Sequence, residues 1–238
     1  MKEKHSLDQN RVKAVLFDMD GVLIDAKDWH YEALNEALAL FGHKIRRSEH
    51  LETYDGLPTK TKLRMLSKER ELPEGLHDFI NEMKQAYTID IAWRNCRPTF
   101  CHEYALARLA KDGYRIAVCS NSVRASIEMM LGKAALLDHV DLIVSNQDVQ
   151  RPKPDPEMYA KAVTSFGLEA HECLVVEDNP NGIAAATAAG CHVLVVDHVG
   201  EVEFTRIRAR IEQIEAEAAH ATTTSTTEKH ASTHPALR

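Results

Sequence analysis

The sequence has little that would place it in a membrane or outside the cell. No apolar run approaches the length of a membrane-spanning helix, and the polar residues 1–10 lack the apolar core of a signal peptide. The five cysteines are odd in number and include no Cys-x-x-Cys pair. Cys119, Cys173 and Cys191 lie in or beside apolar runs, where small buried thiols are expected. We therefore expect a soluble protein of the reducing cytoplasm.

Positive charge is also scarce, with 29 lysines and arginines against 36 aspartates and glutamates and a formal net charge of −7. Because a nucleic-acid backbone requires a basic surface, this balance argues against a nucleic-acid partner. Histidines outside the motifs discussed below show no paired ligand spacing, so no zinc site is expected. Nothing in the sequence requires assembly, so a monomer is plausible and the oligomeric state stays open.

The chain does contain enough apolar residues, 44% of 238, for one large domain or a domain with a modest insert. After residue 97, short apolar runs alternate with segments of helical period. This alternation predicts a parallel sheet covered by helices on both faces. The expected strands are 13–17, 115–119, 142–144, 173–176 and 192–196, and the expected core helices are 103–111, 122–131, 156–166 and 180–189.

Between about residues 26 and 95 the sequence contains helical spacing and no convincing strand. We therefore predict an α/β fold with a Rossmann-like core formed by residues 11–25 and 96–200. A helical insert over 26–95 follows the first strand, with helices expected over 28–41, 60–69 and 76–93. The rest is expected to form a ragged leader over 1–10, a charged helix over 201–220 and a disordered tail over 221–238.

The first strand ends in two carboxylates, Asp18 and Asp20, followed by Gly21. Residues two apart in an extended backbone point to the same side, so both carboxylates should face one small volume. Such a pair is tolerated when a cation lies between the carboxylates, or when they divide nucleophilic and acid–base work. Gly21 then permits a turn that a Cβ would resist. Alone, this stretch would be interpreted as a solvated turn, and three later segments argue against that alternative.

Three further strand ends carry polar residues that suit chemistry on an anion. Ser120 and Asn121 follow the second strand just before a helix start, where free N–H groups favour an anion. Lys153 lies between two prolines after the third strand, and Glu177 and Asp178 follow the fourth. Ligands of open parallel sheets bind at the carboxyl ends of the strands, where all these groups should meet. The set is typical of phosphoryl transfer.

The order Asp-x-Asp-Gly-Val-Leu-Ile-Asp, Ser-Asn, Lys-Pro and Glu-Asp-x-x-x-Gly, within residues 12–197, resembles the haloacid dehalogenase superfamily of phosphatases and phosphomutases. The resemblance implies that Asp18 attacks the phosphoryl group and becomes an aspartyl phosphate. It implies that Asp20 protonates the leaving oxygen and then activates water. Ser120 would donate to a phosphate oxygen, Asn121 would contact the substrate, and Lys153 would neutralise the phosphate.

The resemblance also implies a metal and a lid. Mg²⁺ would be held by the Asp18 carboxylate, the backbone carbonyl of Asp20 and Asp178, with Glu177 nearby or acting through water. The insert is similar to the cap of the family's first structural class, which closes over the site and selects small substrates.

The segment 56–60 lies where relatives carry a substrate-specificity loop. Thr59 and Lys60 are therefore expected substrate contacts. Lys60 together with Lys62 could equally form a solvated helix face.

His30 bears on which reaction the chain carries out. β-Phosphoglucomutases of the family have a histidine here that assists proton transfer, and many plain phosphatases have one too. A satisfied core histidine is the alternative, because His30 shares a helical stripe with Leu34 and Ala37. Ala26 stands where mutases usually have a hydroxyl residue, and no arginine follows 56–57, where mutases have one that grips phosphate.

We therefore expect a Mg²⁺-dependent phosphatase acting on a small phosphorylated metabolite, with a sugar or polyol phosphate as the expected substrate. The alternative is a sugar phosphomutase on the same scaffold. A non-catalytic phosphate-binding protein is disfavoured, because no member of the motif set is missing.

Overall fold

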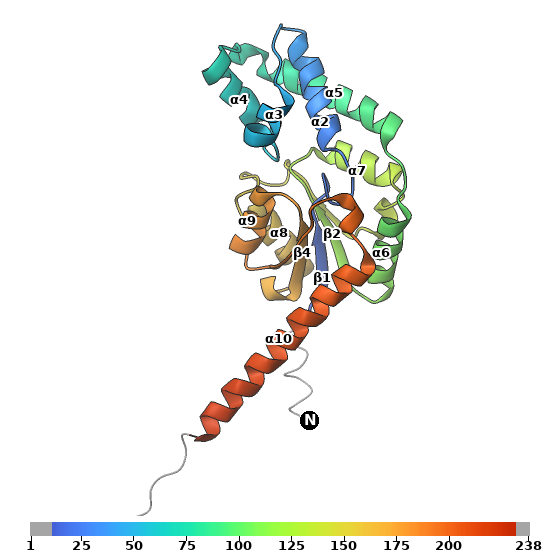
Figure 1. Ribbon diagram of the computed structural model, residues 1–238, viewed down its shortest axis with the longest axis vertical. Helices are drawn as coiled ribbons and strands as arrows, with labels where there is room; N and C mark the ends of the chain where they lie inside the picture. Colours follow the sequence, from blue (N-terminus) through green and yellow to red (C-terminus); the bar gives the residue numbers. More distant parts are fainter. Residues whose placement is uncertain (1–10, 232–238) are drawn as a thin grey trace, which may run out of the picture.

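The described part of the chain, residues 11–231, folds around a sheet of five parallel strands (Figure 1). In this computed structural model the strands follow the spatial order β3-β2-β1-β4-β5, which places β1 at the centre. Each expected strand is present, with ends within one residue of the prediction. The strands are β1 (Ala14–Phe17), β2 (Arg115–Cys119), β3 (Leu142–Val144), β4 (Cys173–Glu177) and β5 (His192–Val195). The leader expected over 1–10 lies outside the described residues.

The sheet is buried on both faces, as its near-continuous apolar strands predict. Side chains of β1 alternate between two hydrophobic clusters, with Val15 and Phe17 in one and Ala14 and Leu16 in the other. Helices α6 (Phe100–Lys111) and α7 (Arg124–Lys133) pack on the first face, and α8 (Glu157–Phe166) and α9 (Pro180–Ala188) on the second (Figure 1). The predicted α/β core is confirmed.

Side-chain hydrogen bonds to the backbone lie at the starts of two core helices, α9 and α8. The Asn179 side chain accepts a hydrogen bond from the Asn181 N–H, and Pro180 occupies the first turn of α9. The Asp155 carboxylate likewise accepts from the Glu157 N–H at the start of α8. Three short 3₁₀ helices complete the core connections, at Leu137–His139, Ala170–Glu172 and Val199–Glu201.

All regular structure in the fully described stretch 26–95 is helical, and it forms a lobe above the carboxyl ends of the strands (Figure 1). This cap has its own hydrophobic cluster, separate from those of the sheet. The cap elements are α2 (Lys27–Ala39), α3 (Arg47–Glu49), a π-helix (His50–Tyr54), α4 (Thr59–Arg70), a 3₁₀ helix (Glu74–Leu76) and α5 (His77–Asn95). The buried residues of this hydrophobic cluster are Leu34, Ala37, Leu38, Ile45, Tyr54, Leu63, Leu66, Leu72 and Ile80.

The sequence did not predict the short helical segment 47–54. It is too short for a periodic apolar stripe, and it is held by tertiary contacts. Tyr54 is fully buried in the cap cluster and donates a hydrogen bond to Glu69 at 2.7 Å.

The chain ends in a long helix, α10 (Phe204–Ala231), which runs along the core and extends past it (Figure 1). Its first half packs through Ile207, Ile211 and Ile214, the thin apolar side that the sequence indicates. The expected end of this helix at residue 220, and a disordered tail from 221, are wrong for residues 221–231. This stretch contains no glycine or proline, and threonine costs a helix only a few tenths of a kcal/mol, about 0.7 at most. Residues 232–238 lie outside the described part.

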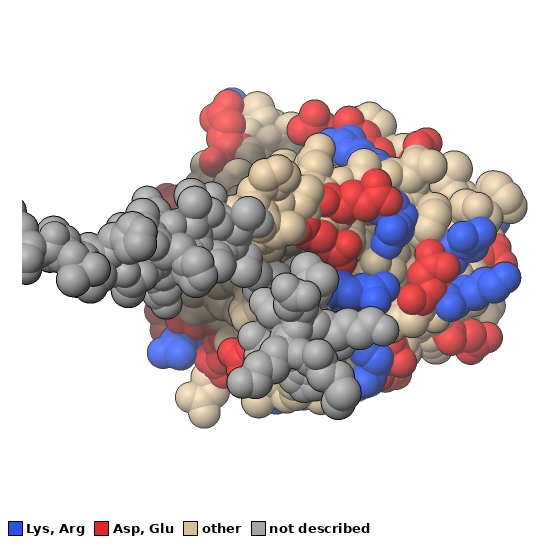
Figure 2. Space-filling model, turned by 90° about the horizontal axis from the view of Figure 1, so that it is seen from below, with Lys and Arg blue, Asp and Glu red and all other residues tan. Residues whose placement is uncertain are grey.

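The surface carries charges of both signs (Figure 2), and the cysteines are unpaired. On the end of the molecule away from the cap, acidic and basic side chains are interspersed over the visible face (Figure 2). The five cysteines are free thiols, and Cys101 alone is exposed among them. Within residues 11–231, the helices are all too short or too polar to cross a bilayer.

Candidate active site

Asp18 and Asp20 leave the end of β1 at the centre of the sheet edge that faces the cap. The Asp18 N–H donates to the Val176 carbonyl of β4 at 3.0 Å, and the Asp18 side chain is almost completely buried. Gly21 follows with a φ of +100°, in the left-handed region that glycine tolerates. A Cβ here would lie 2.2 Å from an Asp178 carboxylate oxygen, so the turn also requires the absence of a side chain.

Lys153 connects the carboxylates of two strands. Its ammonium lies 2.7 Å from Asp18 Oδ1 and 2.7 Å from Glu177 Oε1, and it donates to the Cys119 carbonyl at 2.9 Å. Burial alone would lower the pKa of Lys153, but the charges of Asp18 and Glu177 outweigh this and raise it. Burial raises the pKa of Asp18, and the Lys153 ammonium opposes that rise. The lysine therefore holds a positive charge against the Asp18 carboxylate in a site shielded from water.

Glu177 uses both carboxylate oxygens within the protein. Oε1 accepts from Lys153 and from the Tyr159 hydroxyl at 2.8 Å, while Oε2 accepts from the N–H groups of Asp178 and Asn179 at 3.0 and 3.1 Å. A Cβ on Gly182 would lie 1.6 Å from Glu177 Oε1, so glycine there makes room for the carboxylate. This arrangement favours an indirect role for Glu177 toward a metal.

Asp178 differs from Glu177 because Lys27 is the one side chain that contacts its carboxylate within the described residues. Its Oδ1 is buried without a hydrogen-bond partner, while Oδ2 lies 2.5 Å from the Lys27 ammonium. Burial raises the pKa of Asp178 despite the opposing Lys27 charge. One carboxylate oxygen from each of Asp18, Glu177 and Asp178 lies within 4.8 Å of the other two. An all-oxygen set with one unsatisfied oxygen fits Mg²⁺, which takes one or two carboxylates and keeps several waters.

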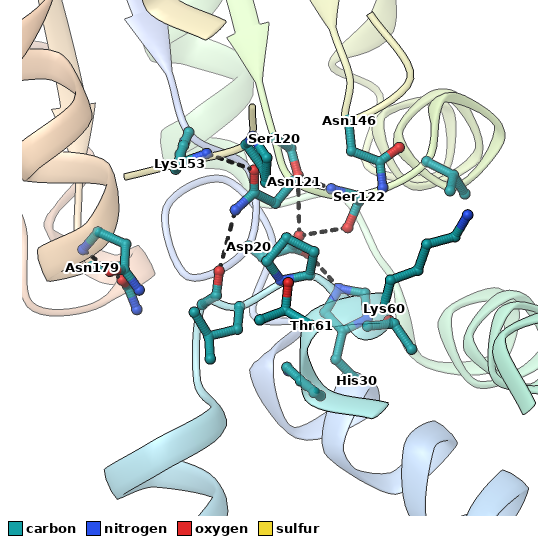
Figure 3. A pocket seen from close by; sticks show the side chains of 18 of the residues that line it. Asp20, His30, Lys60, Thr61, Ser120, Asn121, Ser122, Asn146, Lys153 and Asn179 are labelled. Atoms are coloured by element: carbon teal, nitrogen blue, oxygen red, sulfur yellow. Dashed lines mark hydrogen bonds and ion pairs between the residues drawn. The ribbon is translucent and has the colours of Figure 1, made fainter. Parts of the chain in front are cut away.

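Asp20 lies at the centre of a hydrogen-bond network between core and cap (Figure 3). Ser122 donates to its Oδ2 at 2.9 Å and Ser120 at 3.3 Å, while His30 Nε2 lies 2.9 Å from Oδ1. Lys84 of α5 lies 3.0 Å from the other ring nitrogen, Nδ1. An ammonium can only donate, so Nδ1 accepts and the neutral imidazole carries its proton on Nε2, directed at Asp20.

The charges of this network follow from its geometry. Burial acts to raise the pKa of Asp20, but the interactions with His30 and the Ser122 hydrogen bond lower it to about 2. Burial and then the Lys84 ammonium lower the pKa of His30. Near neutral pH, Asp20 is therefore a carboxylate held by a neutral histidine. His30 has partners at both ring nitrogens and also lines the cavity described next, where it faces Asp20.

A cavity of about 570 Å³ lies between the core and the cap. Core residues Asp18, Asp20 and Lys153 form its floor, and α4 and α5 of the cap contribute to its roof. Asn121 bridges the two sides, since its amide donates to the Gly56 carbonyl at 3.2 Å and accepts from the Lys153 N–H at 3.2 Å (Figure 3). A cavity of this volume has room for a small molecule.

The expected cap contacts Thr59 and Lys60 both line this cavity, although Lys60 is exposed. The alternative of a solvated face is wrong for Lys62, which is buried and also lines the cavity. Lys27 and Lys84 were not expected in the site at all. Their only sequence signal is position on a cap helix, because the contacts to Asp178 and His30 depend on how the cap folds over the core.

Comparison with known proteins agrees with this architecture. Residues 15–196 match the family model of haloacid dehalogenase-like hydrolases. The chain is 30% identical to a phosphoglycolate phosphatase of Nitrosospira multiformis, covering 79% of this chain and 84% of that protein. It is 25% identical to a phosphorylated carbohydrates phosphatase of Thermotoga maritima, covering 75% and 82%. A β-phosphoglucomutase structure from Clostridium difficile matches its fold with a TM-score of 0.73 at 22% identity, covering 85% and 98%.

Proposed function

Because the chain belongs to the haloacid dehalogenase-like hydrolase family, we propose that it is a Mg²⁺-dependent phosphatase that cleaves a small phosphomonoester through an aspartyl phosphate. The observation that carries this proposal is the pair of carboxylates, Asp18 and Asp20, at the floor of the cavity. Asp18 is held by the Lys153 ammonium, and Asp20 lies two residues away with its own hydrogen-bond partners. One carboxylate is thus prepared for attack and the other for proton transfer.

In the first half-reaction, an Asp18 oxygen forms a bond to phosphorus while the bond from phosphorus to the ester oxygen breaks. Lys153 binds Oδ1, which leaves Oδ2 for the attack. Asp20 gives its proton to the departing oxygen, which leaves as an alcohol. The approach of an anionic phosphate raises the pKa of a neighbouring carboxyl, so substrate binding favours the protonated Asp20 that this step needs.

In the second half-reaction, Asp20 accepts a proton from water as the water oxygen attacks phosphorus. The bond between phosphorus and Asp18 breaks, inorganic phosphate leaves, and both carboxyl groups return to their starting forms. The His30 and Ser122 hydrogen bonds favour the carboxylate form of Asp20, which is the base this step requires. Ser120 and Asn121 are proposed to donate to the phosphate and to the substrate.

We propose that Mg²⁺ is held by Asp18, Asp178 and the backbone carbonyl of Asp20. Glu177 then has an indirect role. When bound, the ion neutralises charge on the transferring phosphoryl group and fixes its orientation. The buried, unpartnered Asp178 Oδ1 supports this assignment.

Lys27 competes with this cation for Asp178, because its ammonium contacts Oδ2. We therefore expect Lys27→Met to tighten Mg²⁺ binding about 10-fold, which corresponds to about 1.4 kcal/mol. Calorimetric titration of Mg²⁺ into protein without substrate measures this, and the Mg²⁺-dependent rise in Tm gives a second readout. Lys44→Met, which removes an exposed charge elsewhere in the cap, should leave the affinity unchanged. Equal Mg²⁺ affinities of Lys27→Met and wild type would show that the Lys27 ammonium leaves Asp178 without a free-energy cost when Mg²⁺ binds.

A sugar phosphomutase is the second candidate, favoured by the hydrogen bond of His30 to Asp20 under a closed cap. The two candidates differ in the fate of the aspartyl phosphate, which water cleaves in a phosphatase and a second substrate hydroxyl attacks in a mutase. Thr59 and Lys60 follow the turn at Gly56–Leu57 without an arginine, which supports the phosphatase.

The deciding experiment measures phosphate release from a panel of sugar, polyol and carboxylic-acid monophosphates, with Mg²⁺ and with EDTA. We expect metal-dependent release from a narrow class, since the named relatives act on phosphoglycolate and on phosphorylated carbohydrates. Isomerisation of glucose 1-phosphate only when a sugar bisphosphate is added, without phosphate release, would assign the mutase instead. Inactivity in both assays would leave a phosphate-binding protein.

The free thiols support the proposal of a reducing, cytoplasmic setting.

A further inference from the structure

Three aromatic side chains form a connected set on the surface of the core, outside the cavity. Phe100, the first residue of α6, is 78% exposed, the highest value among the large hydrophobic side chains of the described residues. Its ring stacks on that of Tyr104 with 5.9 Å between the centroids, and Tyr104 meets Phe204 of α10 edge-on at 6.0 Å. The Arg108 guanidinium lies 5.1 Å from the centroid of the Phe204 ring. These contacts fix an aromatic platform, defined as Phe100, Tyr104 and Phe204, across two helices.

The packing of the chain does not explain why this platform is exposed. Phe100 keeps most of its surface in water and Tyr104 is 44% exposed, so these two rings contribute little to the core. None of the three residues lines the cavity. Exposed apolar patches mark interaction surfaces, and aromatic side chains are enriched at the centres of protein–protein interfaces. The platform therefore has the character of an interface that a single chain leaves open.

The charges on either side of Phe100 identify a second copy of this chain as the partner. Arg97 precedes Phe100 by three residues, Glu103 follows it by three, and both are exposed. Within the described residues neither forms an ion pair, and the Arg97 guanidinium donates only to the adjacent Cys96 carbonyl, at 2.8 Å. An isologous interface brings residue i of one copy to residue j of the other, and j to i. A twofold axis at Phe100 therefore brings Arg97 of each copy to Glu103 of the other.

We propose that two copies of the chain associate through the aromatic platform, with the twofold axis beside Phe100. The Phe100 rings meet at the axis, and two ion pairs between Arg97 and Glu103 flank them. The rings supply the buried apolar area, while the charges fix the antiparallel orientation of the two α6 helices. Helix α6 lies on the flank of the core, below the cap (Figure 1). The association is independent of the proposed phosphatase function, because none of its residues lines the cavity.

Sedimentation velocity of the full chain tests the proposal over a concentration range of about 1 to 200 µM. We expect a reversible dimer with a dissociation constant in the micromolar range, because one aromatic platform forms a small interface. Phe100→Ser should weaken the dimer by at least about 100-fold, since symmetry makes each substitution act twice at the centre of the interface. Phe79→Ser is the matched control. It removes a ring that is 48% exposed on the cap helix α5 and should leave the dimer unchanged.

Exchange of the flanking charges tests the orientation of the two copies. Arg97→Glu and Glu103→Lys should each weaken the dimer by about 10-fold or more, because like charges then face each other across the axis. An equimolar mixture of the two variants should associate about as tightly as wild type, since each contact of the mixed dimer again pairs opposite charges. The Tm of each variant checks that it is folded.

Cys101 provides an independent readout of the same geometry. It follows Phe100 directly and is exposed, unlike the other four cysteines, so each copy carries it close to the axis. A short bismaleimide reagent should therefore join two wild-type chains covalently. Phe100→Ser and Cys101→Ser should both give no covalent dimer at the same protein concentration.

Three outcomes would overturn the proposal. The first is a wild-type chain that stays monomeric at about 200 µM, which would show that a second copy does not cover the platform. The second is a dimer that Phe100→Ser leaves intact or that Phe79→Ser abolishes, which would place the interface elsewhere. The third is a mixture of Arg97→Glu and Glu103→Lys that fails to associate where wild type does, which would exclude a twofold axis at Phe100.

Discussion

Asp18→Asn is expected to reduce phosphate release by at least about 10⁴-fold with the fold unchanged, because it replaces the attacking oxygen by an amide of the same shape. The side chain lies at the cavity floor, where Lys153 holds it in place. Metal affinity should fall as well, since one carboxylate ligand is lost.

The measurement is kcat for the best substrate of the panel, with Tm as the check on folding. Asp25→Asn is the matched control, because this exposed carboxylate lies on the same segment without lining the cavity. Activity within about 10-fold of wild type in Asp18→Asn would exclude the covalent route. It would instead require direct attack by water.

Lys153→Met is expected to cost about 3–5 kcal/mol of stability and to abolish activity. It leaves the carboxylates of Asp18 and Glu177 buried without their shared cation, which is the costly way of breaking a buried ion pair. The Glu177 side chain is fully enclosed and cannot turn to water. Methionine has nearly the length of lysine, so the loss reports charge more than volume.

Denaturant unfolding in EDTA measures this cost, with Lys111→Met as an exposed control expected within about 0.5 kcal/mol of wild type. Burial already raises the pKa of Asp18, and removal of Lys153 removes the charge that opposes this rise. A carboxyl with a raised native-state pKa destabilises the fold as pH rises through that pKa, and protonation relieves the penalty below it. The stability difference should therefore be smaller at pH 5 than at pH 8. An equal difference at both pH values would contradict the electrostatic explanation.

Much of the fold was predictable because its signals are local. The strand at 14–17 is a continuous apolar run, and the helix at 180–188 begins with Pro180 directly after the capping Asn179. The meeting of Asp18, Lys153 and Glu177 was also predictable, since the carboxyl ends of parallel strands share one edge. These predictions require only chain order and strand direction.

The sequence-based prediction failed at two segments, and each failure has a physical cause. Residues 221–231 were assigned to a tail because threonine-rich sequence cannot bury a core, yet the backbone of a helix needs no core when an existing helix propagates into it. The segment 47–54 was missed because Tyr54 folds it by packing into the cap rather than by any pattern of its own.

What the sequence by itself determined is therefore the α/β class, the helical insert and the groups at the sheet edge, through periodicity, caps and motif order. The tertiary structure alone decided which lysines are exposed, which are buried and which contact residues of the site. Lys60 is exposed and Lys62 buried two residues along one helix, and Lys84 reaches His30 across 54 positions. The reason is that a lysine's role depends on the charges and the solvent around its ammonium, and these are set by the packing of the cap against the core.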